Sequence, residues 1–321
     1  MAAIDILGGT FAGIAAAVRL ARLGHTVALV EPDPGWAELL RGELGDGTLD
    51  FPAPWRDLLK KSGRPAVGAL GRHGLELVPD SDDPPTDRGH LWYADRDALG
   101  PVAADAWRSF VDAADDTWQA LRPLGLESEL AAAVATRAAL DPRRSLADAA
   151  RRLPHPVLQD RVLSLAEDYE QRPADLPSWL VSRFSVHRTF GRWRLLGPAG
   201  ERRPASDLVD VLIDRLTDRD VRVVDTAGGA PVRVETRDPG HRWHRPRRLR
   251  RSDSFVDQLL ARPGTRTEDP ACFHASASSP AGREPWAQLL SGALAAYAVH
   301  RLTTGEDVRP GSDARGGITA L

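Results

Sequence analysis

The chain is poor in the residue types that form disulfides and thiolate metal sites. It has 321 residues and one cysteine, Cys272. A single cysteine excludes an internal disulfide and a cysteine-rich metal site, and it fits a reducing compartment. Lysine occurs only at Lys60 and Lys61, and the net charge is −3. Without a basic excess there is no overall electrostatic attraction to nucleic acid, so nucleic acid is not an expected partner.

The chain also lacks a long apolar run. The best candidate, residues 287–299, has charged residues before it and His300 and Arg301 after it, and it is too short to span a bilayer. The first predicted strand begins at Ile4, which leaves no room for a secretory leader in this sequence. We therefore expect a cytoplasmic chain without a transmembrane segment. Peripheral membrane contact and assembly into homo- or hetero-oligomers stay open.

A strand, a tight turn, a helix and a second strand open the chain. The apolar run 4–7 stops at a glycine pair, an alanine-rich helical pattern follows, and the apolar run 26–30 ends in Glu31. This order and spacing are typical of a βαβ unit that holds the phosphates of a dinucleotide at the helix N-terminus and its ribose at the acid. The alternative is an ordinary βαβ unit that binds nothing.

The turn departs from the usual glycine pattern at one position. In the pattern G-x-G-x-x-G, Gly8 takes the first place, Thr10 the third and Gly13 the last. The central glycine normally lets the backbone approach the pyrophosphate closely. A threonine there either narrows the site or supplies a hydroxyl donor to a phosphate oxygen.

Helical and strand periodicities predict the elements that follow. Ser145 and Asp148 have the spacing of a capping box, and Ser206 and Asp207 are expected N-caps of a later helix. Residues 74–78 form an edge strand or a loop. We expect helices at 36–44, 103–121, 127–140, 146–153, 157–170, 208–216 and from about 285 to 302, and strands at 221–224, 231–236 and about 271–275.

Two segments have a structural and a functional interpretation. The aromatic residues of 103–121 lie on one helical stripe, which favours core packing over a ligand wall. The arginine-rich segment 241–251 either grips phosphate groups or is a solvated loop, and we favour the loop. His241 and His244 have metal-ligand spacing but no acidic or thiol partner nearby in sequence, so we expect no metal site.

Three separated pieces of the chain together resemble one family. They are Gly8-Gly9-Thr10-Phe11-Ala12-Gly13 with Glu31, the segment 188–193, and the segment 273–280 with 289–296. In this order they are similar to FAD-dependent oxidoreductases of the phytoene-desaturase group, which are also described as carotenoid-desaturase or amine-oxidase-like. The resemblance covers about half of the chain.

The resemblance implies a fold, a cofactor and a set of site residues. The fold is α/β, with a Rossmann-like FAD/NAD(P)-binding domain assembled from N-terminal, middle and C-terminal segments. Residues 1–40 are its βαβ unit, 41–194 a mainly helical insertion for the substrate, 195–305 its remainder and 306–321 a mobile tail. The cofactor-binding residues carried over from the family are Gly8, Gly9, Thr10, Phe11, Ala12 and Gly13 for the pyrophosphate, Glu31 for the ribose, Val224 near the adenine, and Ser276, Ser278 and Gly282 beside the flavin.

The chemistry implied is hydride transfer from a lipophilic small molecule to flavin N5, and it demands no particular catalytic side chain. Arg188, His187 and His274 are the polar residues nearest to the resembling segments. The alternative is a non-catalytic member that keeps the fold as a binding or partner protein, which Thr10 and the small-residue loop near Arg283 motivate. An NAD-linked dehydrogenase is disfavoured by the C-terminal segment, and an NADP-linked one also by the charge of Glu31.

Overall fold

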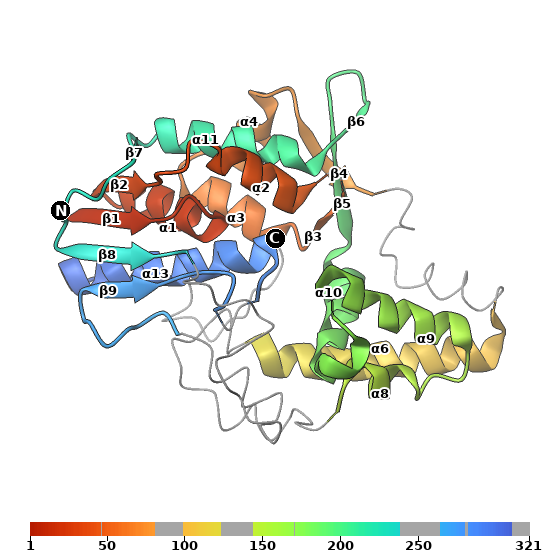
Figure 1. Cartoon of the computed structure of the whole chain (residues 1–321). Helices are drawn as coiled ribbons and strands as arrows, with labels where there is room; N and C mark the ends of the chain where they lie inside the picture. Colours follow the sequence, from red (N-terminus) through yellow and green to blue (C-terminus); the bar gives the residue numbers. More distant parts are fainter. Residues whose placement is uncertain are drawn as a thin grey trace.

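A computed structural model describes most of the chain (Figure 1). The described residues are 1–45, 47–80, 99–122, 144–169, 171–237, 264–279 and 282–309. The predicted helix 127–140, the arginine-rich segment 241–251 and residues 310–321 of the expected tail lie outside them.

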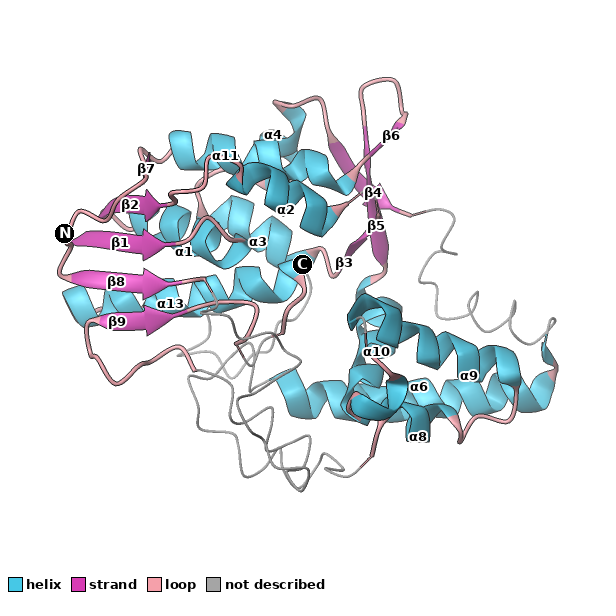
Figure 2. Ribbon diagram, viewed as in Figure 1, coloured by secondary structure: helices cyan, strands magenta, loops and turns pink. Residues whose placement is uncertain are grey.

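A five-stranded parallel sheet organises the described residues (Figure 2). Along the sheet, β7 (Arg222–Val224) is followed by β2 (Thr26–Val30), β1 (Ala3–Leu7), β8 (Val232–Glu235) and β9 (Cys272–His274). Every neighbouring pair is parallel. Leu7 lies opposite Val30 on one side and Glu235 on the other, so all the strands end at one edge of the sheet. The predicted α/β fold class is confirmed at this level.

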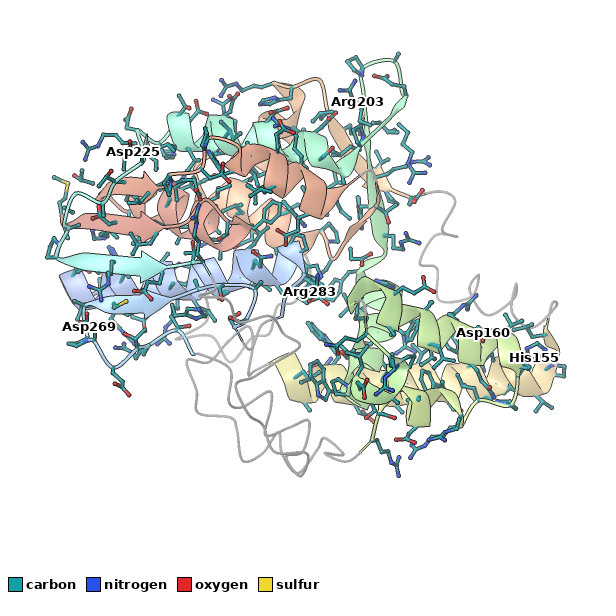
Figure 3. All side chains as sticks on the ribbon, viewed as in Figure 1. His155, Asp160, Arg203, Asp225, Asp269 and Arg283 are labelled. Atoms are coloured by element: carbon teal, nitrogen blue, oxygen red, sulfur yellow. The ribbon has the colours of Figure 1, made fainter. Side chains whose placement is uncertain are left out.

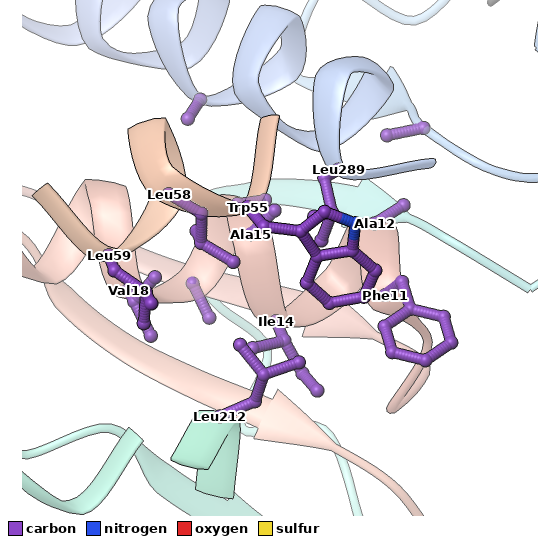
Figure 4. Close-up of a cluster of buried hydrophobic side chains, with 14 of the residues drawn as sticks. Phe11, Ala12, Ile14, Ala15, Val18, Trp55, Leu58, Leu59, Leu212 and Leu289 are labelled. Carbon is purple, nitrogen blue, oxygen red and sulfur yellow. The ribbon is translucent and has the colours of Figure 1, made fainter. Parts of the chain in front are cut away.

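Two helices from opposite ends of the chain pack closely together on this sheet. They are α1 (Phe11–Arg22) and α13 (Pro285–Thr304). Their contact is built from glycine and alanine: a Cβ at Gly292 would lie 2.2 Å from the carbonyl oxygen of Ala12. Helices α3 (Ala53–Lys61) and α11 (Leu208–Thr217) complete this core, and Figure 4 shows Trp55, Leu58, Leu212 and Leu289 around α1.

A second, antiparallel sheet stands beside the parallel one. Strand β5 (Arg192–Leu196) lies between β3 (Leu49–Asp50) and β4 (Glu76–Pro79), and β6 (Arg202–Arg203) also pairs with β5. Helices α2 (Trp36–Leu44) and α4 (Ala66–Gly71) precede β3 and β4 in the chain. The sequence analysis allowed an edge strand at 74–78 but did not predict this sheet.

A helical unit with its own core follows α4 and β4 (Figure 1). It contains α6 (Pro101–Arg122), α8 (Leu146–Ala150), α9 (Pro156–Leu163) and α10 (Ser182–Phe190), with 3-10 turns at Ser164–Tyr169, Pro173–Asp175 and Ser178–Val181. Trp107 and Val111 of α6 are buried among apolar residues of α8 and α9. This confirms the core interpretation of the aromatic stripe. Trp118, nearer the end of α6, packs instead on the core of the parallel sheet.

The helix ends agree with the sequence in one case and differ in another. Ser145 and Asp148 form the predicted capping box, in which each side chain accepts a hydrogen bond from the backbone N–H of the other residue. Ser206 and Asp207 do not cap α11 with their side chains. They belong to a 3-10 turn, Ala205–Asp207, that leads directly into the helix. Asp207 is the N-cap residue as predicted, but without a capping side-chain hydrogen bond, and Ser206 is not the N-cap.

No helix in the described ranges is long and apolar enough to cross a membrane, as the sequence predicted. Within the same ranges, no group of three or more histidine, cysteine, aspartate or glutamate side chains is arranged to hold a metal ion.

Two buried histidines join the start of β2 to the end of α13. The backbone N–H of Ala2 donates to Nδ1 of His25 at 3.3 Å, so the ring proton of neutral His25 is on Nε2. That nitrogen lies 2.9 Å from Nδ1 of His300 and donates to it. Burial lowers the pKa of His25 below its ordinary value of 6.5, and His300 and the N-terminal ammonium lower it further.

Replacing Gly292 by alanine should destabilise the protein by about 1–3 kcal/mol, because the added methyl group meets backbone and forces α1 and α13 apart. Gly42 of α2 is the matched control, since nothing lies within 4 Å of its Cβ position. Gly42→Ala should raise stability by up to about 1 kcal/mol through helix propensity. Urea unfolding measures both. Equal changes in stability for Gly292→Ala and Gly42→Ala would contradict the close packing of α1 on α13.

The His25 pair should make stability depend on pH. The folded state binds the His25 proton less tightly than the unfolded chain, so stability is fully present above pH 6.5 and is lost as pH falls through the folded pKa. His25→Gln should remove this part of the pH dependence. Urea unfolding at a series of pH values from above 6.5 downward measures the stability at each pH. If the variant shows the same pH dependence as the wild type, His25 is not its source.

Candidate functional site

The sequence-predicted site residues meet at one edge of the parallel sheet. Gly8 follows β1, Glu31 follows β2, Val224 ends β7 and Ala275 follows β9, and the register places these strand ends side by side. Ser276, Ser278 and Gly282 lie on the connection from β9 to α13. The structure therefore brings two of the three resembling segments, the glycine turn with Glu31 and the segment 273–280, to the same edge of the sheet. The third segment, 188–193, lies instead at the end of α10 and the start of β5.

Glycine is required at the turn between β1 and α1. Gly8 has a φ of +123°, which side-chain-bearing residues rarely adopt. A Cβ at Gly13 would lie 2.1 Å from the carbonyl oxygen of Gly8, so the first turn of α1 packs directly on the preceding backbone. Thr236 of the neighbouring chain segment donates its hydroxyl proton to the same carbonyl at 2.8 Å. These contacts fix the turn before any ligand is present.

Thr10 acts as the N-cap of α1. Its hydroxyl oxygen accepts the N–H of Gly13 at 3.1 Å. The Gly8 N–H donates to Val30 and the Gly9 N–H to Glu31. Among the hydrogen bonds of the described residues, the N–H groups of residues 10, 11 and 12 have no acceptor. Three donors at a helix N-terminus face an anion favourably, because the helix dipole adds to them.

The side chains of Phe11 and Ala12 point into the core. Phe11 is fully buried and packs edge-on against Trp55, with ring centroids 5.7 Å apart. Ala12 is buried beneath Gly292. Both residues are fully buried, so their side chains offer nothing to a ligand, and what remains are backbone N–H groups without an acceptor.

The carboxylate of Glu31 is buried and fully engaged. One oxygen accepts the Gly9 N–H at 2.8 Å, and the other accepts the Asp33 N–H at 3.0 Å and pairs with the guanidinium of Arg237. Only 2% of the Glu31 side chain is exposed. The sequence predicted the acid but not Arg237, which lies 206 residues further on and reaches Glu31 only because β8 pairs with β1.

An indole ring covers the glycine pair. A Cβ at Gly9 would lie 2.7 Å from Trp36, the first residue of α2, and one at Gly8 would lie 2.6 Å from Arg237. Trp36 and Arg237 therefore occupy the space directly above the turn. The sequence analysis placed Trp36 on a helix but gave it no role.

The serines of the C-terminal loop form a small buried network. The hydroxyl of Ser276 lies 3.0 Å from Nε2 of His274 and 3.1 Å from the hydroxyl of Ser278. Ser278 also donates its N–H to Ser276 at 3.1 Å. Both serines are buried, so they shape the loop beside the sheet edge rather than presenting free hydroxyl groups.

A second polar cluster lies where β3, α10 and the start of α13 meet. Asp50 accepts a hydrogen bond from Nε2 of His187 at 3.0 Å, and Arg183 and Arg192 approach it at 3.5 and 3.8 Å. Arg183 also lies 3.9 Å from Glu284, the residue before α13. Figure 3 labels the adjacent Arg283, which lies between the parallel-sheet unit and the helical unit.

Asp50 stays ionised in this cluster. Burial alone would raise the pKa of Asp50, but the hydrogen bond from His187 and the charges of His187, Arg183 and Arg192 outweigh it and hold the pKa below 3.8. Sequence reasoning singled out His187 for its position beside a resembling segment, but it missed Asp50, since nothing local marks an acid in a two-residue strand.

Phe51, which follows Asp50, has an unusual backbone conformation. Its φ is +49°, a conformation that is costly for a residue with a side chain and that concentrates at functional sites. Its ring is buried against Phe190, Trp118 and Trp286, with centroids 4.2, 5.9 and 5.1 Å away. This packing compensates for the strain and directs the carboxylate of Asp50 toward His187.

Asp50→Asn should destabilise the protein by about 1–3 kcal/mol, because it removes the negative charge that faces the half-buried Arg183 and His187 and the exposed Arg192. Asp175→Asn is the control, because its ion pair with Arg172 is exposed. Such pairs contribute about 0–1 kcal/mol. Thermal unfolding at neutral pH compares the two variants. Equal losses of stability in the two variants would contradict a stabilising role for the charge of Asp50.

Comparisons with known proteins do not identify a family. No family model matches the chain, and no curated protein matches it. Among solved structures, the PF1083 protein from Pyrococcus furiosus is similar over 73% of this chain, with a TM-score of 0.40 and 13% sequence identity. The match covers 58% of that protein's length. Similarity at this level says nothing about function, which therefore has to be inferred from the site itself.

Proposed function

We propose that the carboxyl edge of the parallel sheet binds FAD and that the protein is a flavin-dependent oxidoreductase acting on a lipophilic small molecule. The observation that carries this proposal is the glycine turn between β1 and α1, where three N–H groups have no acceptor among the described hydrogen bonds. In chain order, the strands of the sheet run 3-2-1-4-5, the order in which dinucleotides bind at the point where the connections reverse direction. That point lies between β1 and β8, where the turn is.

The residues present fit the phosphate part of FAD. The N–H groups of Thr10, Phe11 and Ala12 would hold the pyrophosphate once Trp36 and Arg237 have moved from above the turn. The Glu31 carboxylate would hold the ribose hydroxyl groups once Arg237 has moved from it. Val224 at the end of β7 would lie on the adenine side.

FAD, when bound, supplies the hydride acceptor. The chain's own residues then position the reactants and exclude water. The buried rings of Phe51 and Trp286 and the half-buried ring of Phe190 form an apolar wall next to the connection before α13. His187 and Asp50 are the ionisable pair beside that wall, where a proton can be held at Nε2 of His187.

A second candidate function is a binding or partner protein that keeps this fold without the cofactor. Trp36 and Arg237 favour it, because they fill the space above Gly8 and Gly9 with the chain's own side chains. The two candidates differ in whether those side chains yield to a nucleotide.

The visible spectrum of the purified protein, with and without added FAD, tests the proposal. We expect flavin bands that stay with the protein through gel filtration. Gly13→Val should abolish them, because the larger side chain meets the Gly8 carbonyl, whereas Gly42→Ala should leave them unchanged.

Trp36→Ala separates the two candidates. A wild-type protein that stays colourless in excess FAD, with a Trp36→Ala variant that also stays colourless, would overturn the flavin proposal and support the binding protein. A colourless wild type with a yellow variant would show a flavin site closed by Trp36, which also supports the second candidate for the natural chain.

A further inference from the structure

Basic side chains gather at the ends of α1, α3 and α11 and around α4, which Figure 1 labels. We define this basic surface by its six cationic residues: Arg22, Lys60, Lys61, Arg64, Arg72 and Arg219. It includes both lysines of a chain whose net charge is −3. The concentration of positive charge is therefore local.

Contacts between the elements show that these residues share one surface. Arg72 after α4 pairs with Asp218 after α11 at 2.8 Å. A Cβ at Gly63, in the turn after α3, would lie 2.0 Å from Arg219 and 2.5 Å from Arg22. The guanidinium groups of these two arginines therefore converge over one turn.

Most of this charge is not neutralised within the described chain. Of the six residues, only Arg72 has a carboxylate partner among the described ion pairs. Asp218 divides its charge between Arg72 and the buried Arg215, and Asp214 pairs with His73, so these two acids are already engaged. Like charges that converge without a counter-charge favour an external anion.

An exposed apolar residue lies on α4, between Arg64 and Arg72 in the sequence. Val67 on α4 is 86% exposed, the largest exposed fraction among the large apolar residues after Met1. The small residues Gly68 and Gly71 are exposed beside it. Cationic side chains around an exposed apolar residue suit the boundary between lipid headgroups and acyl chains.

A membrane fits this surface better than an acidic protein. The residues that dominate protein–protein interfaces are aromatic as well as arginine, and none of the large exposed apolar residues in the described ranges is aromatic. We propose that the basic surface docks the protein on a membrane that contains anionic lipids. The proposal does not depend on flavin binding.

Co-sedimentation with vesicles tests this docking. Wild-type protein should bind vesicles of equal parts phosphatidylglycerol and phosphatidylcholine, release them at high salt, and not bind vesicles of phosphatidylcholine alone. The triple variant Lys60→Gln, Lys61→Gln, Arg64→Gln should bind about 100-fold more weakly, at the usual contribution of each basic residue near an anionic surface. Val67→Glu should also bind more weakly.

The matched control is the triple variant Arg151→Gln, Arg152→Gln, Arg172→Gln, which removes the same charge from exposed or half-buried positions of the helical unit. It should bind as the wild type does, and circular dichroism should show all variants folded. Equal loss in both triple variants, equal binding to both vesicle types, or no vesicle binding would overturn the proposal. Release of the protein from the vesicles by inorganic phosphate, added at the same concentration as the lipid, would overturn the proposal too. It would show that the surface binds a small free anion instead of a membrane.

Discussion

The contact between α1 and α13 is the constraint on which the rest of the structure depends. Both helices carry small residues where they meet, so backbone lies against side-chain carbon without intervening bulk. That closeness places the start of α1 and the connection before α13 at the same sheet edge. The glycine turn, the serine loop and the Asp50 cluster are neighbours because of it. A larger residue in the contact between α1 and α13 would displace the glycine turn and the serine loop as well as the core.

The charges of Glu31, at the edge of the parallel sheet, and of Asp50, on the antiparallel sheet, are balanced largely by groups of the chain itself. Glu31 is held by two backbone N–H groups and Arg237, and Asp50 by His187 and two arginines. Each carboxylate is stabilised by hydrogen bonds or charges from residues that are distant in the sequence. A ligand here must therefore compete with interactions that already exist, and the first turn of α1 is the place where donors remain available.

The sequence predicted what local patterns encode. The β1–α1–β2 unit, the α8 capping box and the stripe of α6 follow from spacing and side-chain type alone. The antiparallel sheet was missed because β3 and β6 have only two residues each, too few to show alternation. The partners of Glu31 and Asp50 were missed because tertiary pairing, not sequence spacing, brings Arg237 and His187 to them.

The position of α13 near the end of the described chain also bears on how the protein folds. The first three elements are complete by Val30, but the helix that covers α1 starts at Pro285. During synthesis, the side of α1 that packs on α13 has no permanent partner until residues from Pro285 onward have emerged from the ribosome. Such non-local closure slows folding and leaves apolar surface exposed in the meantime. The alanine-rich character of α1 limits that exposure, because each alanine presents little apolar area to a wrong partner.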